Sequence, residues 1–141
     1  NIVVQMGLVR HVVRFFGEPL ALRIGLLFSI AGMLTYAFAP NGWVFLAGIA
    51  FQSLAGIMGP ALQALITRRV SGNDQGKLQG ALSSAIGIAG MIGPILFSQV
   101  FAWALGAGAS FGVPGAAFVV AALLNVLALG VAWQATRQRG R

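Results

Sequence analysis

Two long stretches without a charged side chain dominate the sequence. They cover residues 24–67 and 78–136, which are 44 and 59 residues long. A membrane-spanning helix needs about 20 mostly apolar residues, so each stretch predicts two helices joined by a turn. We therefore predict an all-α, polytopic helical membrane protein with four full transmembrane helices and the end of a fifth. The full helices are expected over residues 20–39, 43–67, 78–105 and 114–133, and the partial one over residues 1–9.

The basic residues mark one side of the predicted helices. All nine Lys and Arg residues lie in or beside alternate loops and end segments of the predicted helices, here called joints. The two remaining joints carry none. Because positively charged loops stay on the cytoplasmic side of a membrane, the joints with Lys and Arg are expected there, together with the carboxyl terminus. The predicted cytoplasmic joints are residues 10–19, 68–77 and 134–141.

The composition agrees with a membrane protein and argues against several other classes. Hydrophobic residues make up 58% of the chain and charged residues 8%, with a mean hydropathy of +0.89. Average soluble domains carry roughly 25% charged residues. The chain has no cysteine, and its one histidine and two acids are His11, Glu18 and Asp74. We expect no enzyme, no metal site and no cofactor, since these residues cannot form a catalytic triad or a metal cluster.

The net charge of +7 does not change this interpretation. Basic residues gathered at the ends of membrane helices are explained by the orientation of those helices in the membrane. No nucleic-acid partner is therefore expected. Asn1 begins within an apolar stretch rather than after a Met and a basic region, a beginning that resembles a cut in a longer chain and leaves open where the native chain begins.

Small and polar residues recur on one face of the second and third predicted helices. At about 100° per residue, those of the second helix fall within a sector roughly 100° wide. Polar residues in a bilayer turn towards a water-filled cavity or the bundle interior, whereas small ones also let helices pack closely. Spacing alone leaves both interpretations open. The candidate cavity-lining residues are Gln52, Gly56, Gly59, Gln63, Ser84, Gly87 and Met91.

Two prolines and one asparagine also stand out within the predicted helices. Pro60 and Pro94 each remove a backbone hydrogen bond, so both are expected to kink their helices. Asn125 lies in an otherwise apolar helix, where a hydrogen bond to a neighbouring helix is expected. No predicted helix contains a carboxylate. Because proton relays in membrane carriers rest on buried acids, this chain is not expected to carry protons by itself.

Three segments resemble the tetracycline-resistance type of drug exporter in the major facilitator superfamily. They are residues 59–70, 74–80 and 92–97. The most specific of them is the loop motif formed by Asp74, Gln75, Gly76, Lys77, Gln79 and Gly80. The resemblance extends over nearly the whole chain, from the end of the eighth span of such exporters through the twelfth, which makes the chain part of a carboxyl-terminal bundle.

This resemblance implies a carrier of twelve spans that exchanges a cationic or metal-complexed drug for a proton in the bacterial inner membrane. The second and third full helices would correspond to spans ten and eleven, which border the central cavity in such carriers. It therefore favours cavity lining over packing for Gln52, Gln63 and Ser84. The loop motif would lie at the cytoplasmic entrance and hold the bundle together. Drug and protons are the implied partners, the protons through the amino-terminal half that this chain lacks.

One departure and two alternatives accompany the resemblance. In these exporters the loop after the eighth span often has an aspartate beside its basic residues. This chain has Arg10, His11 and Arg14 in that region without an aspartate. The alternatives to a transporter are a non-transporting membrane scaffold or assembly subunit, and a fragment inactive on its own.

Overall fold

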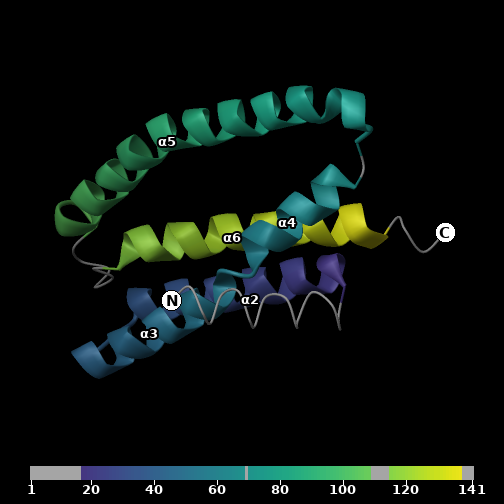
Figure 1. The fold of residues 1–141 in the computed structure, drawn as a ribbon. Helices are drawn as coiled ribbons and strands as arrows, with labels where there is room; N and C mark the ends of the chain where they lie inside the picture. Colours follow the sequence, from purple (N-terminus) through teal and green to yellow (C-terminus); the bar gives the residue numbers. More distant parts are fainter. Residues whose placement is uncertain (1–16, 69, 109–114, 138–141) are drawn as a thin grey trace.

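The structure, a computed structural model, describes residues 17–68, 70–108 and 115–137 (Figure 1). Its helices are α2 (Glu18–Ala37), α3 (Gly42–Ala55), α4 (Met58–Thr67), the short 3₁₀ helix η1 (Gly72–Asp74), α5 (Gln75–Leu105) and α6 (Ala116–Arg137). The partial helix expected over residues 1–9 lies outside the described residues, as do Arg10, His11 and Arg14.

Four stretches of the described chain are long and apolar enough to cross a membrane: α2, α3 together with α4, η1 together with α5, and α6. The predicted all-α class with four full transmembrane helices is therefore confirmed. The ends of the helices differ from the predicted ones by two to four residues at several places, most of all at the last helix, which extends to Arg137.

Local sequence explains where the first two helices begin. Gly17 precedes α2 with a φ of +75°, in the left-handed region that glycine adopts without strain. Pro19 follows in the first turn, where its missing N–H leaves no helical hydrogen bond unmade. At the start of α3, the side-chain oxygen of Asn41 accepts a hydrogen bond of 3.0 Å from the Val44 N–H. This cap satisfies one of the free donors at the helix start.

The second predicted helix is interrupted in its middle. The α-helix α3 ends at Ala55, and α4 begins at Met58. Between them, the N–H groups of Gly56 and Ile57 bond to carbonyls three residues back, those of Ser53 and Leu54. This tighter turn precedes Pro60, which lies in the first turn of α4 and cannot donate to the Gly56 carbonyl.

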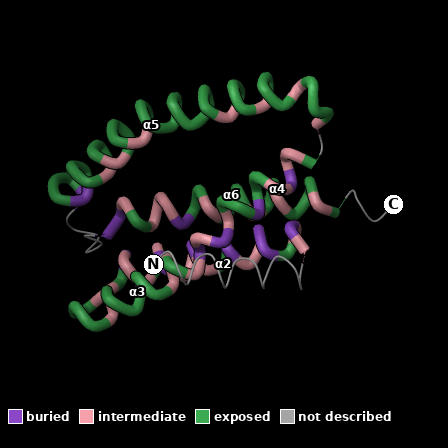
Figure 2. The backbone as a smooth tube through the Cα atoms, in the orientation of Figure 1, coloured by how far each residue is buried: buried purple, intermediate pink, exposed green. Residues whose placement is uncertain are grey.

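The core of the described region lies around α2, which packs against α3, α4 and α6. Its buried apolar residues are Ala21, Leu22, Leu26, Ile57, Ala61 and Leu65. Figure 2 shows that the buried positions gather on α2 and on the neighbouring parts of α4 and α6, whereas α5 is exposed along nearly its whole length. The helix α5 therefore stands apart from the core, with contacts to α6 and η1.

Candidate functional site

The predicted polar face of the second helix divides at the break between α3 and α4. Gln52 on α3 is half-buried, and its side chain lies so close to α2 that a Cβ added at Gly32 would meet the Gln52 Cγ at 3.1 Å. Gly56 is half-buried in the turn between the two helices. In the described structure, the α3 part of this face serves helix packing.

The α4 part of the same face is open. Gly59 and Gln63 are both exposed, and a Cβ added at Gly59 would meet no atom of the described structure within 4 Å. Thr67, one turn after Gln63, donates its hydroxyl to the Gln63 carbonyl at 2.8 Å. The amide of Gln63 therefore stands on an uncovered surface, the position that a residue facing a cavity would take.

The candidate residues of α5 are exposed as well. Ser84, Gly87 and Met91 all lie on the surface, and Met91 is 74% exposed. A Cβ added at Gly87 would meet nothing within 4 Å among the described residues. The helix continues through Pro94 without interruption, and Figure 1 shows it curving along its length. Helix α5 thus exposes these small and polar residues together with large apolar ones, such as Ile86 at 72% and Ile95 at 66%, and it contains one proline.

The loop motif has its own hydrogen bonds at the start of α5. The Asp74 carboxylate accepts 2.8 Å and 3.1 Å hydrogen bonds from the Lys77 ammonium and the Ser71 hydroxyl. Asp74 is the residue before α5 but its side chain makes no capping bond to that helix. The other residues of the motif lie exposed on the first turns of α5: Gln75, Gly76, Gln79 and Gly80. These contacts hold the loop to the helix that follows it.

An ion pair joins the beginning of α2 to the end of α4. The Glu18 carboxylate lies 2.9 Å from the Arg68 guanidinium. The Glu18 side chain is 10% exposed and that of Arg68 is 68% exposed, so the pair lies at the surface with its acid turned inward. Sequence reasoning missed this contact, because 50 positions separate the two residues and no local pattern links them.

A second polar contact joins α2 to α6. The Arg23 guanidinium donates a hydrogen bond to the Thr136 hydroxyl and lies 4.2 Å from the centre of the Trp133 ring. A cation over an aromatic face is attracted by the ring electrons. The Arg23 Nε is buried and has no hydrogen-bond partner within the described part of the chain.

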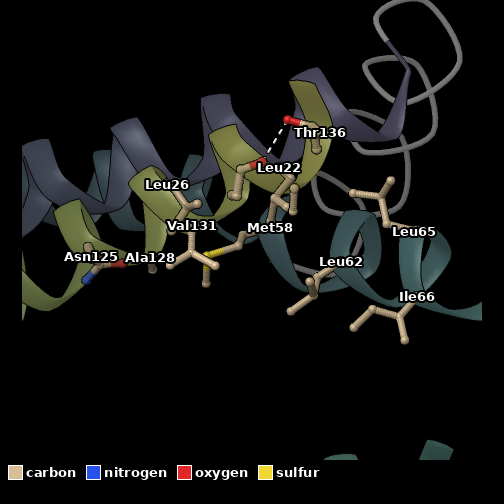
Figure 3. Close-up of a pocket in the computed structure, with 12 residues that line it drawn as sticks. Leu22, Leu26, Met58, Leu62, Leu65, Ile66, Asn125, Ala128, Val131 and Thr136 are labelled. Carbon is tan, nitrogen blue, oxygen red and sulfur yellow. Dashed lines mark hydrogen bonds between the residues drawn. The ribbon is translucent and has the colours of Figure 1, made fainter. Parts of the chain in front are cut away.

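Beside this contact, α2, α4 and α6 enclose an apolar groove of about 520 Å³ (Figure 3). Leucines and Met58 line it from α2 and α4, and Val131 lines it from α6. Asn125 and Thr136 supply polar side chains on its α6 wall. The hydrogen bond expected from Asn125 to another helix is instead intrahelical, since its amide donates to the Ala121 carbonyl at 2.9 Å.

The described residues bring together no group of three or more His, Asp and Glu side chains that could hold a metal ion. The chemistry they present consists of amides, hydroxyls and small side chains on α4 and α5, arginines at the helix ends and an apolar groove. Together with the four long apolar helices, these features define a multi-pass helical membrane protein.

The sequence profile of the Major Facilitator Superfamily matches residues 6–140, and the chain belongs to this superfamily of membrane transporters. It is 34% identical to the class H tetracycline resistance protein of Pasteurella multocida over 90 residues. This match covers 64% of this chain and 22% of that protein. It is 33% identical over 125 residues to the class G protein of Vibrio anguillarum, covering 83% of this chain and 30% of the relative. The predicted resemblance to the tetracycline-resistance type is thereby confirmed.

The matches extend beyond bacteria. The chain is 28% identical over 101 residues to the hippocampus abundant transcript 1 protein of Mus musculus, covering 72% of this chain and 21% of that protein. No solved structure matches the chain. The chain spans less than a third of the length of the curated relatives described above.

Proposed function

We propose that this chain forms one wall of the substrate cavity of a proton-coupled drug exporter in the bacterial inner membrane. The observation that carries the proposal is the uncovered face of small and polar residues on α4 and α5, which includes Gln63 and Ser84. Polar side chains are costly at a lipid surface, so a face of this kind favours contact with water or solute. Tetracycline is the proposed substrate, because relatives named tetracycline resistance proteins match this chain over 90 and 125 residues.

Protons would be carried outside this chain. Its two acids, Glu18 and Asp74, are at helix ends, and each is paired with a basic side chain. An acid already neutralised by a fixed partner is poorly suited to load and release a proton during each transport cycle. The chain would therefore supply cavity wall and helix bends, as a transporter rather than an enzyme, and the acids that couple to protons would lie in the rest of the exporter.

The proposal is tested with cysteines placed on neighbouring positions of α4 in the complete exporter. Gln63 and Leu62 are both exposed, but Leu62 lines the apolar groove. Gln63→Cys is expected to react with a charged, water-soluble thiol reagent, and added drug should slow the reaction. Leu62→Cys is the matched control and should stay unreactive, because thiolate formation needs water.

The same design extends to α5 and to transport. Ser84→Cys should behave like Gln63→Cys, and cells with the unsubstituted exporter should accumulate less tetracycline until a protonophore removes the proton gradient. Equal reactivity at positions 62 and 63 would refute the assignment of the cavity wall. Accumulation that is unchanged by the exporter would instead favour a non-transporting scaffold.

A further inference from the structure

One exposed face of α6 changes in polarity along the helix. Trp133 on this face is 47% exposed, and the other members named here are exposed as well: Leu123, Leu127 and Arg137. At about 100° per residue, these four side chains fall within a sector roughly 120° wide. We call it the outer face of α6. Its order from leucine through tryptophan to arginine is the order of polarity in a lipid leaflet, from acyl chain through interface to headgroup.

The outer face lies opposite the apolar groove. The groove is lined from α6 by Asn125, Ala128, Val131, Ala132, Ala135 and Thr136. Because each residue turns the helix by about 100°, this set and the outer face point to opposite sides of α6. The packing of α6 against α2 and α4 therefore leaves the outer face uncovered in the part of the chain that the structure describes.

The positive charge at the end of the outer face is not offset by a carboxylate of this sequence. Arg139 and Arg141 follow Arg137 in the sequence and lie outside the described residues. No acidic residue occurs after Asp74. The two acids of the sequence, Glu18 and Asp74, are each paired with a basic side chain other than these three arginines. The end of α6 is thus a basic surface suited to an anionic group.

Trp133 indicates the depth of Arg137 in the membrane. Tryptophan side chains gather where the hydrocarbon meets the headgroups, because the indole is amphipathic. The Arg23 guanidinium lies 4.2 Å from the centre of the Trp133 ring, and arginine side chains also reach towards this polar boundary. Arg137 follows Trp133 by four residues, which is about 6 Å along a helix. The Arg137 guanidinium is therefore expected at the level of the lipid phosphates.

We propose that the end of the outer face binds an anionic phospholipid, with the phosphate at Arg137 and an acyl chain along Leu127 and Leu123. Charge complementarity supports this occupant, because basic side chains beside a membrane helix attract anionic headgroups. A guanidinium can also donate two parallel hydrogen bonds to one phosphate. The proposal goes beyond the orientation of the helices, which needs basic loops but no bound lipid.

The test measures which lipid lies beside Trp133 in the complete transporter. One variant keeps Trp133 as its only tryptophan and is reconstituted with brominated phosphatidylglycerol or brominated phosphatidylcholine, whose bromine atoms quench nearby tryptophan fluorescence. Phosphatidylglycerol should be preferred at least about fivefold, the effect expected of one basic residue near an anionic lipid. The matched variant keeps Trp43 alone. Trp43 is 81% exposed beside a turn without charge, and it should show no preference.

Substitutions at Arg137 test the role of its charge. Arg137→Gln should lower the preference at Trp133 about fivefold, and Arg137→Lys should keep it, because lysine retains the charge. Lys77→Gln is the control: it removes one positive charge at the start of α5, where Lys77 pairs with Asp74, and should leave the preference unchanged. In the unsubstituted transporter, a phosphatidylglycerol with a photoactivatable headgroup should label α6 near Trp133, which checks the site even if a tryptophan variant fails to fold.

Several results would overturn the proposal. Equal quenching of Trp133 by the two lipids, or an equal loss of preference with Lys77→Gln and Arg137→Gln, would show that Arg137 does not recognise the headgroup. The same preference at Trp43 as at Trp133 would show that anionic lipid does not collect at this end of α6. Quenching of Trp133 by neither lipid would mean that protein covers the outer face in the complete transporter. None of these results depends on drug transport, so the lipid site can fail while the proposed function stands.

Discussion

Gly48 controls how closely α3 approaches α2. A Cβ added at this position would meet the Tyr36 ring at 2.5 Å, nearer than real side chains come. The ring has little room to move away, because it lies between two other aromatic rings. Its centre is 4.6 Å from that of Phe45 and 5.4 Å from that of Phe118. The lack of a larger side chain at Gly48 therefore allows α3 to lie this close to Tyr36 of α2.

We expect Gly48→Ala to destabilise the protein. The added methyl group overlaps the Tyr36 ring, and such overpacking costs about 1–3 kcal/mol of unfolding free energy. The measurement is thermal unfolding of the complete transporter in detergent, followed by tryptophan fluorescence. Gly59→Ala is the control, because nothing described lies within 4 Å of its added Cβ and alanine favours a helix. Equal melting temperatures for the two variants would contradict the packing role of Gly48.

Single residues also show where prediction from the sequence stops. The loop motif at Asp74 is recognisable from its residues through the family resemblance, and its hydrogen bonds join residues only three positions apart. The contact of Arg23 with Thr136 joins residues 113 positions apart, and no local pattern indicates it. Gln52 shows the same limit: its spacing leaves a cavity wall and a packing face both open, the family resemblance favours the cavity wall, and in the described structure Gln52 lies against α2 beside Gly32.

At the scale of elements, the two prolines act differently although their sequence context is similar. Pro60 lies in the first turn of α4, just after the helix has already been interrupted. Pro94 lies inside α5, and its ring removes the hydrogen bond that the Gly90 carbonyl would otherwise accept. The polar sector expected for the second helix requires one continuous helix over residues 43–67, whereas the observed face divides at Gly56.

Replacing these prolines should therefore have unequal effects. Pro94→Ala restores a backbone donor within α5 and should raise the unfolding free energy of the complete transporter by about 1 kcal/mol. Pro60→Ala restores a donor next to an existing break and should change it much less. The melting temperatures of the Pro94→Ala and Pro60→Ala variants, measured side by side, show which proline has the larger effect. A stabilisation by Pro60→Ala that matches or exceeds the one by Pro94→Ala would show that the break at Gly56 depends on the proline.

At the scale of the whole molecule, hydropathy accounts for the number of helices but not for their packing. Long apolar stretches predict four transmembrane helices, because a bilayer requires this length and composition. They do not distinguish α2, which lies at the centre of the core, from α5, which stands apart from it. Both helices are apolar and contain small residues, so the difference depends on which partners each one meets.

The distribution of charge predicts the orientation of this assembly in the membrane. The joint of Pro40 carries no charge, whereas the joint of Asn73 contains Arg68, Arg69 and Lys77. Positively charged loops stay in the cytoplasm, so the two joints should lie on opposite sides. Both positions are exposed, and cysteine can be introduced at each without removing a hydrogen bond described above.

In intact cells, Pro40→Cys of the complete transporter should be labelled by a membrane-impermeant maleimide. Asn73→Cys should be labelled only after the cells are permeabilised. The reverse result, with Asn73→Cys labelled in intact cells and Pro40→Cys only after permeabilisation, would show that the topology is the inverse of the predicted one. Labelling of both positions in intact cells would mean that α3 and α4 together do not span the membrane, against the length and hydropathy of residues 42–67.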